Sequence, residues 1–177
     1  APGEFVSLEH LLHDMRLFKS RSEVSAMRKA AKISIAAHKR AMRFCEPGQM
    51  EYAVEAEILH EFNRYGTEPA YSSIVGGGNN SCVLHYTDNA DELNDGDLLL
   101  IDAGAEYDCY ASDVTRTFPV NGRFSKAQKA LYEVVLAAQL AAIKKVAPGN
   151  HWNAPHAAAV RVLTRGLVKL GILKGKP

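Results

Sequence analysis

One central stretch decides the fold of this chain, LLLIDAGAEYDCYASDVTRTFPV at residues 98–120. It opens with four consecutive apolar residues, which is typical of a strand buried on both faces. The Asn-Asp-Gly sequence at 94–96 predicts a turn before it, and residues 110–120 alternate loosely between apolar and polar types. Further short strands are predicted at 72–75 and 82–86. The middle of the chain is therefore predicted to form a sheet.

Helices are predicted on both sides of this sheet. Apolar residues recur at helical spacing in four segments, at about 24–42, 50–64, 125–147 and 153–170. Two of these helices begin with capping-box spacing, Ser20 with Glu23 and Ser125 with Gln128. In the first helix we expect one buried stripe, made of Val24, Met27, Ala31, Ile35, His38 and Met42. The order of helices, strands and helices favours the α+β class with an antiparallel sheet.

The composition excludes several classes of protein. The chain has 177 residues, 47% of them hydrophobic and 23% charged, which is typical of a globular domain with one core. Its net charge of +1 predicts no nucleic-acid partner, and its apolar runs are far shorter than the ~20 residues that span a membrane. The cysteines Cys45, Cys82 and Cys109 are few and odd in number, which predicts reduced thiols and a cytoplasmic location.

Two aspartates in the central stretch are candidates for catalytic or metal-binding residues. Asp102 directly follows the apolar run, where an ionised carboxylate is costly without compensation. A hairpin centred on residues 107–108 would place Asp113 directly opposite Asp102, with Cβ atoms about 4.5–5.5 Å apart. Their repulsion could be relieved by protonation of one carboxyl group, as in an acid–base pair, or by a divalent cation between them. The alternative is that each aspartate caps a turn or pairs with Arg116 or Arg123.

Several sequence blocks carry a resemblance to a known family. The blocks are MRLFKS at 15–20, LHYTDN at 84–89, DGDLLLIDAG at 95–104, SDVTRTFPVNG at 112–122 and GLVKLGILK at 166–174. Together they resemble the aminopeptidase P (Xaa-Pro aminopeptidase) family, in the pita-bread group that includes creatinase, prolidase and methionine aminopeptidase. The resemblance extends over nearly the whole chain. It implies the first, N-terminal half of a pita-bread fold, with helices packed on a curved antiparallel sheet.

The resemblance also implies a site and a reaction. Asp102 corresponds to a ligand of one metal ion, and Asp113 to a ligand that bridges two divalent ions, for which Mn²⁺ is expected. His85 corresponds to a catalytic histidine that is not a ligand and that holds the substrate or stabilises the tetrahedral intermediate. Tyr71 corresponds to a position that borders the substrate pocket. The implied substrates are peptides with proline second, whose first residue is released by a metal-activated water.

The resemblance implies a division of the chain as well. Residues 1–19 resemble the linker that leaves an N-terminal domain, and residues 20–177 resemble the first half of the metallopeptidase catalytic domain. The family's other ligands, a histidine and two glutamates, have no counterpart in this chain, so the isolated chain is expected to be inactive. Apolar surface that the rest of the fold would cover is expected to favour a homo-oligomer.

Three alternatives remain at this point. The chain could be a non-catalytic pita-bread binding module, although such modules tend to lose the aspartates that this chain has at 102 and 113. It could be a hydrolase like creatinase, which works without metal through its histidine. It could also be a prolidase-type dipeptidase. His85 itself could be a hydrogen-bonded core residue, since it lies between the apolar residues Leu84 and Tyr86.

Overall fold

The computed structural model of the protein describes residue 3 and residues 6–175. The chain forms two compact units, residues 1–122 and residues 123–177, and each is described here by itself. The first unit contains α1 (Glu9–Leu17), α2 (Arg21–Phe44), α3 (Glu51–Arg64), β1 (Glu68–Pro69), β2 (Ile74–Gly77), the 3₁₀ helix η1 (Gly78–Cys82), β3 (Leu98–Ala103), β4 (Ala105–Tyr107), β5 (Tyr110–Ala111) and β6 (Val114–Pro119). The second contains α4 (Lys126–Ile143) and α5 (Ala154–Lys169). None of the helices in the described part of the chain combines the length and apolar character needed to cross a membrane.

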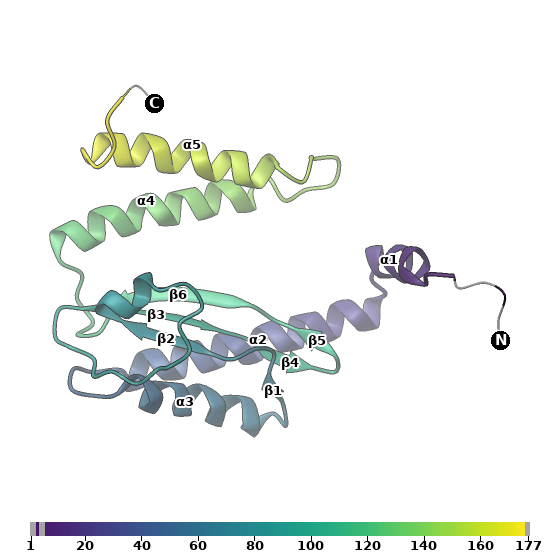
Figure 1. The fold of residues 1–177 in the computed structure, drawn as a ribbon, viewed down its shortest axis with the longest axis horizontal. Coiled ribbons are helices and arrows are strands. Elements are labelled where there is room, and N and C mark those ends of the chain that lie inside the picture. The colour runs from purple at the N-terminus through teal and green to yellow at the C-terminus, as the bar shows by residue number, and fades with distance from the viewer. Residues whose placement is uncertain (1–2, 4–5, 176–177) are drawn as a thin grey trace. The chain divides into compact units, whose positions relative to one another are not determined.

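The first unit is built on two small antiparallel sheets, with strand orders β2-β3-β6 and β1-β4-β5. Helices α2 and α3 run side by side along the strands (Figure 1). The core between them contains side chains from both helices and from β2 and β3, among them Ile33, Phe62, Val75, Leu99 and Ile101. The predicted combination of helices and an antiparallel sheet is therefore confirmed.

The central hairpin has a different register from the predicted one. Asp102 lies opposite Thr115, and the turn is formed by Asp108 and Cys109. Both turn residues have positive φ angles, 51° and 64°, as a two-residue type I′ hairpin turn requires. The prediction of a turn at 107–108, with Asp113 directly opposite Asp102, is therefore wrong. The register differs by two residues, so the two aspartates still share a face, as diagonal neighbours.

Burial on β3 alternates along the strand. Leu99 and Ile101 are fully buried, whereas Leu98, Leu100 and Asp102 are half-buried. The prediction of a strand buried on both faces is therefore wrong. Only the odd-numbered face of β3 is completely covered by the α2–α3 core, and Asp102 lies on the other face.

The predicted buried stripe of α2 is wrong for most of its members, because only His38, at 3% exposed, is buried and Ala31 is half-buried. Val24, Met27, Ile35 and Met42 are 36–46% exposed. The buried face consists of Ala26, Ala30, Ile33, Ser34, Ala37, His38 and Ala41. Small side chains allow this helix to lie close to the strands, and the exposed Val24, Met27, Ile35 and Met42 form a neighbouring stripe.

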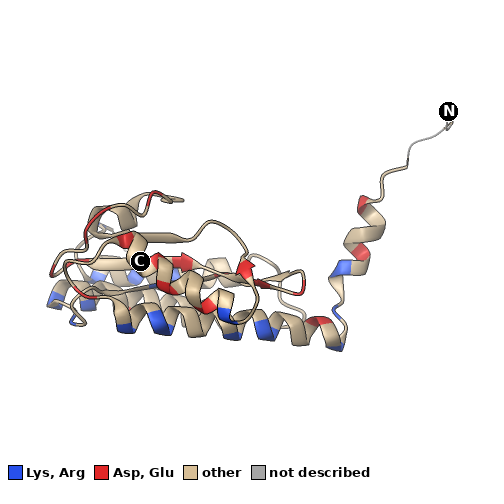
Figure 2. Ribbon diagram, turned by 90° about the horizontal axis from the view of Figure 1, so that it is seen from below, with Lys and Arg blue, Asp and Glu red and all other residues tan. Residues whose placement is uncertain are grey.

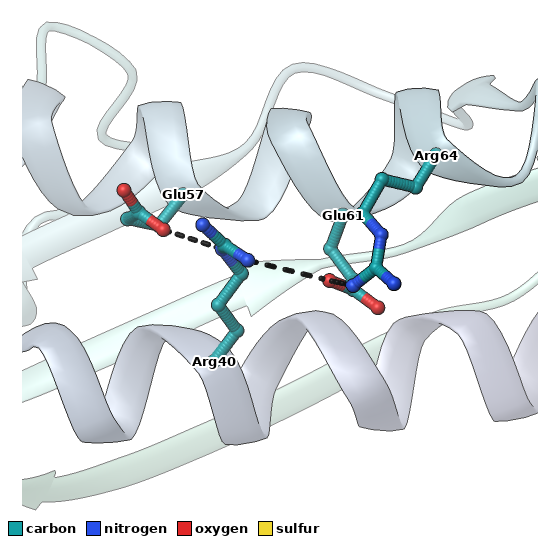
Figure 3. A network of polar contacts seen from close by, with 4 residues as sticks. All are labelled: Arg40, Glu57, Glu61 and Arg64. Atoms are coloured by element: carbon teal, nitrogen blue, oxygen red, sulfur yellow. Dashed lines mark hydrogen bonds and ion pairs between the residues drawn. The ribbon is translucent and has the colours of Figure 1, made fainter.

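Charged side chains join α2 to α3. Arg40 of α2 contacts Glu57 of α3 and lies 3.9 Å from the carboxylate of Glu61, which also pairs with Arg64 at 3.0 Å (Figure 3). Glu61 is only 5% exposed, and the two guanidinium groups compensate its charge. These pairs fix the two helices against each other, and they belong to the scaffold of the unit.

The second unit consists of two helices packed against each other. The predicted capping box at its start is confirmed, because the Ser125 hydroxyl accepts from Gln128 N and the Gln128 side chain accepts from Ser125 N. Gly166 of α5 faces Val134 of α4 so closely that a Cβ atom there would lie 2.3 Å from a Val134 methyl group. Glycine at this position therefore allows the two helices to approach.

The other capping box joins α2 to the hairpin. Glu23 accepts from Ser20 N at 2.6 Å, and its other oxygen accepts from the Tyr110 hydroxyl at 2.6 Å. The Tyr110 bond, and then the Ser20 bonds, lower the pKa of Glu23 from 4.5 to about 2. The folded-state pKa is lowered, so this carboxylate stabilises the fold above pH 4.5, and the contribution disappears as the pH falls towards 2.

We expect Tyr110→Phe to raise the pKa of Glu23 towards its ordinary value, because the substitution removes the largest cause of the shift. The measurement is the pH dependence of the Glu23 carboxyl ¹³C shift by NMR. Tyr52→Phe, at an exposed position of α3, is the control and should leave the value unchanged. An unaltered Glu23 titration in Tyr110→Phe would contradict the assigned hydrogen bond.

Candidate metal centre

The hairpin that carries Asp113 is interrupted where it passes from one sheet to the other. At Gly104 the backbone comes so close to Ser112 that a Cβ atom would lie 1.7 Å from the Ser112 carbonyl oxygen. The buried Ser34 hydroxyl of α2 accepts from Ala105 N at 2.8 Å and lies 2.7 Å from the Ser112 hydroxyl. Ser112 in turn donates to Ala105 O at 2.8 Å. This chain of hydrogen bonds fixes the backbone immediately before Asp113.

Tyr71 brings the two aspartates together. Its hydroxyl lies 2.6 Å from Oδ1 of Asp102 and 3.1 Å from Oδ1 of Asp113. The preceding residue, Ala70, donates its N–H to Gly104 O at 2.8 Å, which places this segment beside the interrupted hairpin. Burial, and then the Asp102 carboxylate, raise the pKa of Tyr71, so the hydroxyl remains a donor at neutral pH.

One hydroxyl hydrogen serves two carboxylates at this site, which leaves their negative charge largely uncompensated. Arg40 and Arg64 form their ion pairs with Glu57 and Glu61 instead. Arg116, considered above as a partner, donates instead to the carbonyl oxygen of Thr115. Adjacent carboxylate oxygens are ligands that suit a hard or borderline divalent cation. The donor set therefore fits such an ion.

The segment that carries the pair lacks basic residues. Residues 65–115 contain no lysine and no arginine. The basic side chains of the first unit lie instead largely along α2 (Figure 2). The near-zero net charge of the whole chain therefore conceals an uneven distribution of charge, in which Arg116 of β6 is the first basic residue after this segment. Within the described part of the chain, however, no three His, Cys, Asp or Glu side chains are grouped as a metal site.

His85 lies in an exposed turn, so the predicted strand at 82–86 is wrong. The preceding residues Gly-Asn-Asn-Ser-Cys form η1 instead, with Ser81 Oγ donating to Gly78 O and Val83 N to Asn80 O. Polar turn-forming residues of this kind compete with a strand. The alternative of a buried core histidine is excluded by this exposure. No hydrogen bond between described residues joins His85 to Asp102 or Asp113.

The backbone of His85 is itself unusual, with a φ angle of 55°. This left-handed region is uncommon for residues other than glycine and persists where the surroundings impose it. The next residue, Tyr86, donates its hydroxyl to Glu51 at 2.7 Å. Burial and this bond raise the pKa of Tyr86, which therefore remains a donor.

Glu51 is a residue that the sequence analysis missed. It is fully buried at the start of α3, and its carboxylate accepts hydrogen bonds from Gly77 N, Asn80 Nδ2, Tyr86 OH and Asp91 N at 2.7–3.1 Å. An acidic residue in the first turn of a helix is ordinarily a surface residue that favours the helix dipole. Nothing local in the sequence distinguishes this buried glutamate from its exposed counterparts.

Comparison with known proteins gives the family. Residues 25–175 match the model of metallopeptidase family M24. The chain belongs to this family. It is 50% identical to the Xaa-Pro aminopeptidase of Escherichia coli strain K12 over 99% of the chain and 40% of that protein. The Haemophilus influenzae Xaa-Pro aminopeptidase is also 50% identical, over 98% of the chain and 40% of its own length.

Solved structures agree with this assignment. The structure of Pseudomonas aeruginosa aminopeptidase PepP superposes with a TM-score of 0.97 at 60% identity, over 99% of this chain and 40% of that one. A zinc-substituted E. coli aminopeptidase P in complex with product gives 0.96 at 50% identity, with the same coverage. The predicted α+β, pita-bread class is therefore confirmed for this member of family M24. The chain spans about 40% of the length of these relatives.

We expect Gly104→Ala to destabilise this family M24 chain by about 3 kcal/mol or more, because the new methyl group would overlap backbone atoms of Ser112. The measurement is urea unfolding followed by circular dichroism. Glu106→Ala, at an exposed position of β4, is the control and should change stability by no more than about 0.5 kcal/mol. Equal stability of the two variants would contradict the close approach.

Proposed function

We propose that this chain contributes the first part of the metal site of an Xaa-Pro aminopeptidase. The observation that carries the proposal is the Tyr71 hydroxyl, which lies within hydrogen-bond distance of both Asp102 and Asp113. It supports a site in which a carboxylate of β3 and one from the residue just before β6 act on one centre. The relatives named as Xaa-Pro aminopeptidases support peptides with proline second as the substrates.

Each residue has a proposed role. Asp102 would hold one divalent ion and Asp113 would be shared between two, with Mn²⁺ as the proposed metal. Bound divalent ions would lower the pKa of a water molecule so that it can attack a peptide carbonyl at neutral pH. Tyr71 orients the two carboxylates and borders the substrate pocket. His85 contacts the substrate or the tetrahedral intermediate from its exposed turn.

The proposal includes the organisation of the longer protein. Residues 1–19 would be the linker from a preceding domain, and residues 20–177 the first half of the catalytic domain. The other ligands, a histidine and two glutamates, would come from outside this chain, so the isolated chain is inactive. A homo-oligomer is proposed, with exposed apolar side chains such as Trp152 supporting further contacts. A cytoplasmic location is proposed from the three free cysteines.

We expect the isolated chain to bind Mn²⁺ only weakly, with Kd on the order of 0.1–1 mM, because a pair of carboxylates is an incomplete ligand set. Isothermal titration calorimetry measures this affinity. Asp113→Asn should weaken binding at least tenfold. Glu106→Gln removes the same charge from an exposed position of the same hairpin and should have little effect. Equal affinities of the two variants would contradict the site.

The activity is tested in a chimera in which this chain replaces its counterpart in the E. coli Xaa-Pro aminopeptidase. We expect the chimera to release the first residue of an Xaa-Pro peptide when Mn²⁺ is present. Asp113→Asn in the chimera should lower kcat/KM at least 100-fold, because the substitution removes a bridging ligand. Glu106→Gln should lower it less than twofold. A folded chimera without activity would overturn the proposed function.

A further inference from the structure

The Glu51 carboxylate lies where three segments of the first unit meet. It accepts from Gly77 at the end of β2, from Asn80 in η1, and from Tyr86 and Asp91 in the following loop. Each carboxylate oxygen accepts two of these four hydrogen bonds. The ion pairs that join α2 to α3 involve Glu57 and Glu61 rather than Glu51. The charge of this buried group is therefore compensated by polar donors, whose loss would be costly.

The loop after His85 is held by the segment that begins α3. Glu51 N donates to Asp91 O at 2.9 Å, Leu93 N to Gln49 O at 2.8 Å, and Gly48 N to Leu93 O at 2.8 Å. Further along the loop, the buried Asn89 side chain accepts from Val75 N and donates to Ser73 O. The residues from Tyr86 onward are therefore fixed to α3 and β2.

The residues before His85 are held at the same centre. Asn80 Nδ2 lies within 3.1 Å of Glu51 Oε1, of the Tyr86 hydroxyl and of Asp91 Oδ2. Residues 83–85, in contrast, are exposed. His85 therefore lies in a short exposed turn whose two ends, Asn80 and Tyr86, are bound to one buried carboxylate.

We propose that Glu51 is a positioning residue for His85. Through the Tyr86 hydroxyl and the Asn80 amide it fixes both ends of the turn, and so imposes the left-handed φ of 55° that directs the imidazole. The inference rests on the role proposed for His85. Displacement of a group that contacts the reacting centre by about 1 Å can cost ~10²-fold in rate, so such an anchor affects catalysis without touching the substrate.

The test uses Tyr86→Phe, which removes only the hydroxyl, in the chimera described above. We expect kcat/KM to fall about tenfold or more while Mn²⁺ affinity stays unchanged. In a His85→Ala background, the same substitution should lower kcat/KM less than twofold, because the residue through which the anchor acts is gone. Equal losses in the two backgrounds, or no loss in either, would overturn the inference.

A second variant tests the carboxylate itself. Glu51→Gln keeps the size of the side chain but replaces one acceptor oxygen with an NH₂ donor. That donor would face two other donors, either those of Gly77 and Asn80 or those of Tyr86 and Asp91. We expect amide hydrogen exchange at residues 83–91 of the 177-residue chain to accelerate at least tenfold, with exchange in β3 unchanged. Equal acceleration in β3 would indicate general destabilisation and overturn the specific role.

The two proposals can fail separately. If the chimera without substitutions is inactive, the proposed function fails, and NMR of the 177-residue chain decides the inference. The Cα and Cβ shifts of His85 report its backbone conformation. The positioning role stands if Tyr86→Phe moves these shifts out of the left-handed range while the β3 shifts stay the same, and it falls if the His85 shifts are unchanged.

Discussion

The approach of two backbone segments at Gly104 is the constraint on which the rest of the first unit depends. The Ser112 carbonyl oxygen occupies the space that any side chain at position 104 would need. This contact interrupts the hairpin between Asp102 and Asp113, and the Ser34 hydroxyl of α2 accepts the hydrogen bond of Ala105 N there and contacts the Ser112 hydroxyl. The close approach at Gly104 thereby fixes α2, the end of β3 and the Asp113 carboxylate relative to one another.

Local signals in the sequence predicted the elements well, whereas contacts between distant segments were harder to predict. The capping boxes at Ser20 and Ser125 depend on residues three positions apart, and both formed. The hairpin register was wrong by two residues, because Asp108 and Cys109 form a type I′ turn without the glycine that usually marks one. The burial of α2 was wrong because two stripes of that helix are apolar, and spacing alone does not say which faces the strands.

At the candidate site, too, features set by neighbouring residues could be predicted, whereas features set by contacts between distant segments could not. The hairpin assumed from the sequence placed both aspartates on one face although its register was wrong, and in the structure the Tyr71 hydroxyl contacts both. The turn at His85 and the burial of Glu51 could not be predicted. Both depend on donors contributed by Gly77, Asn80 and Asp91, which are far from Glu51 in sequence.

The absence of lysine and arginine from residues 65–115 has a consequence for the stabilisation of developing negative charge. His85 is the only histidine in this segment as well. An anionic oxygen formed beside Asp102 and Asp113 would therefore depend on positive charge from outside the segment, such as a bound ion or the Arg116 side chain of β6. The segment contributes acidic and neutral polar groups, and the charge that balances them has to be brought to it.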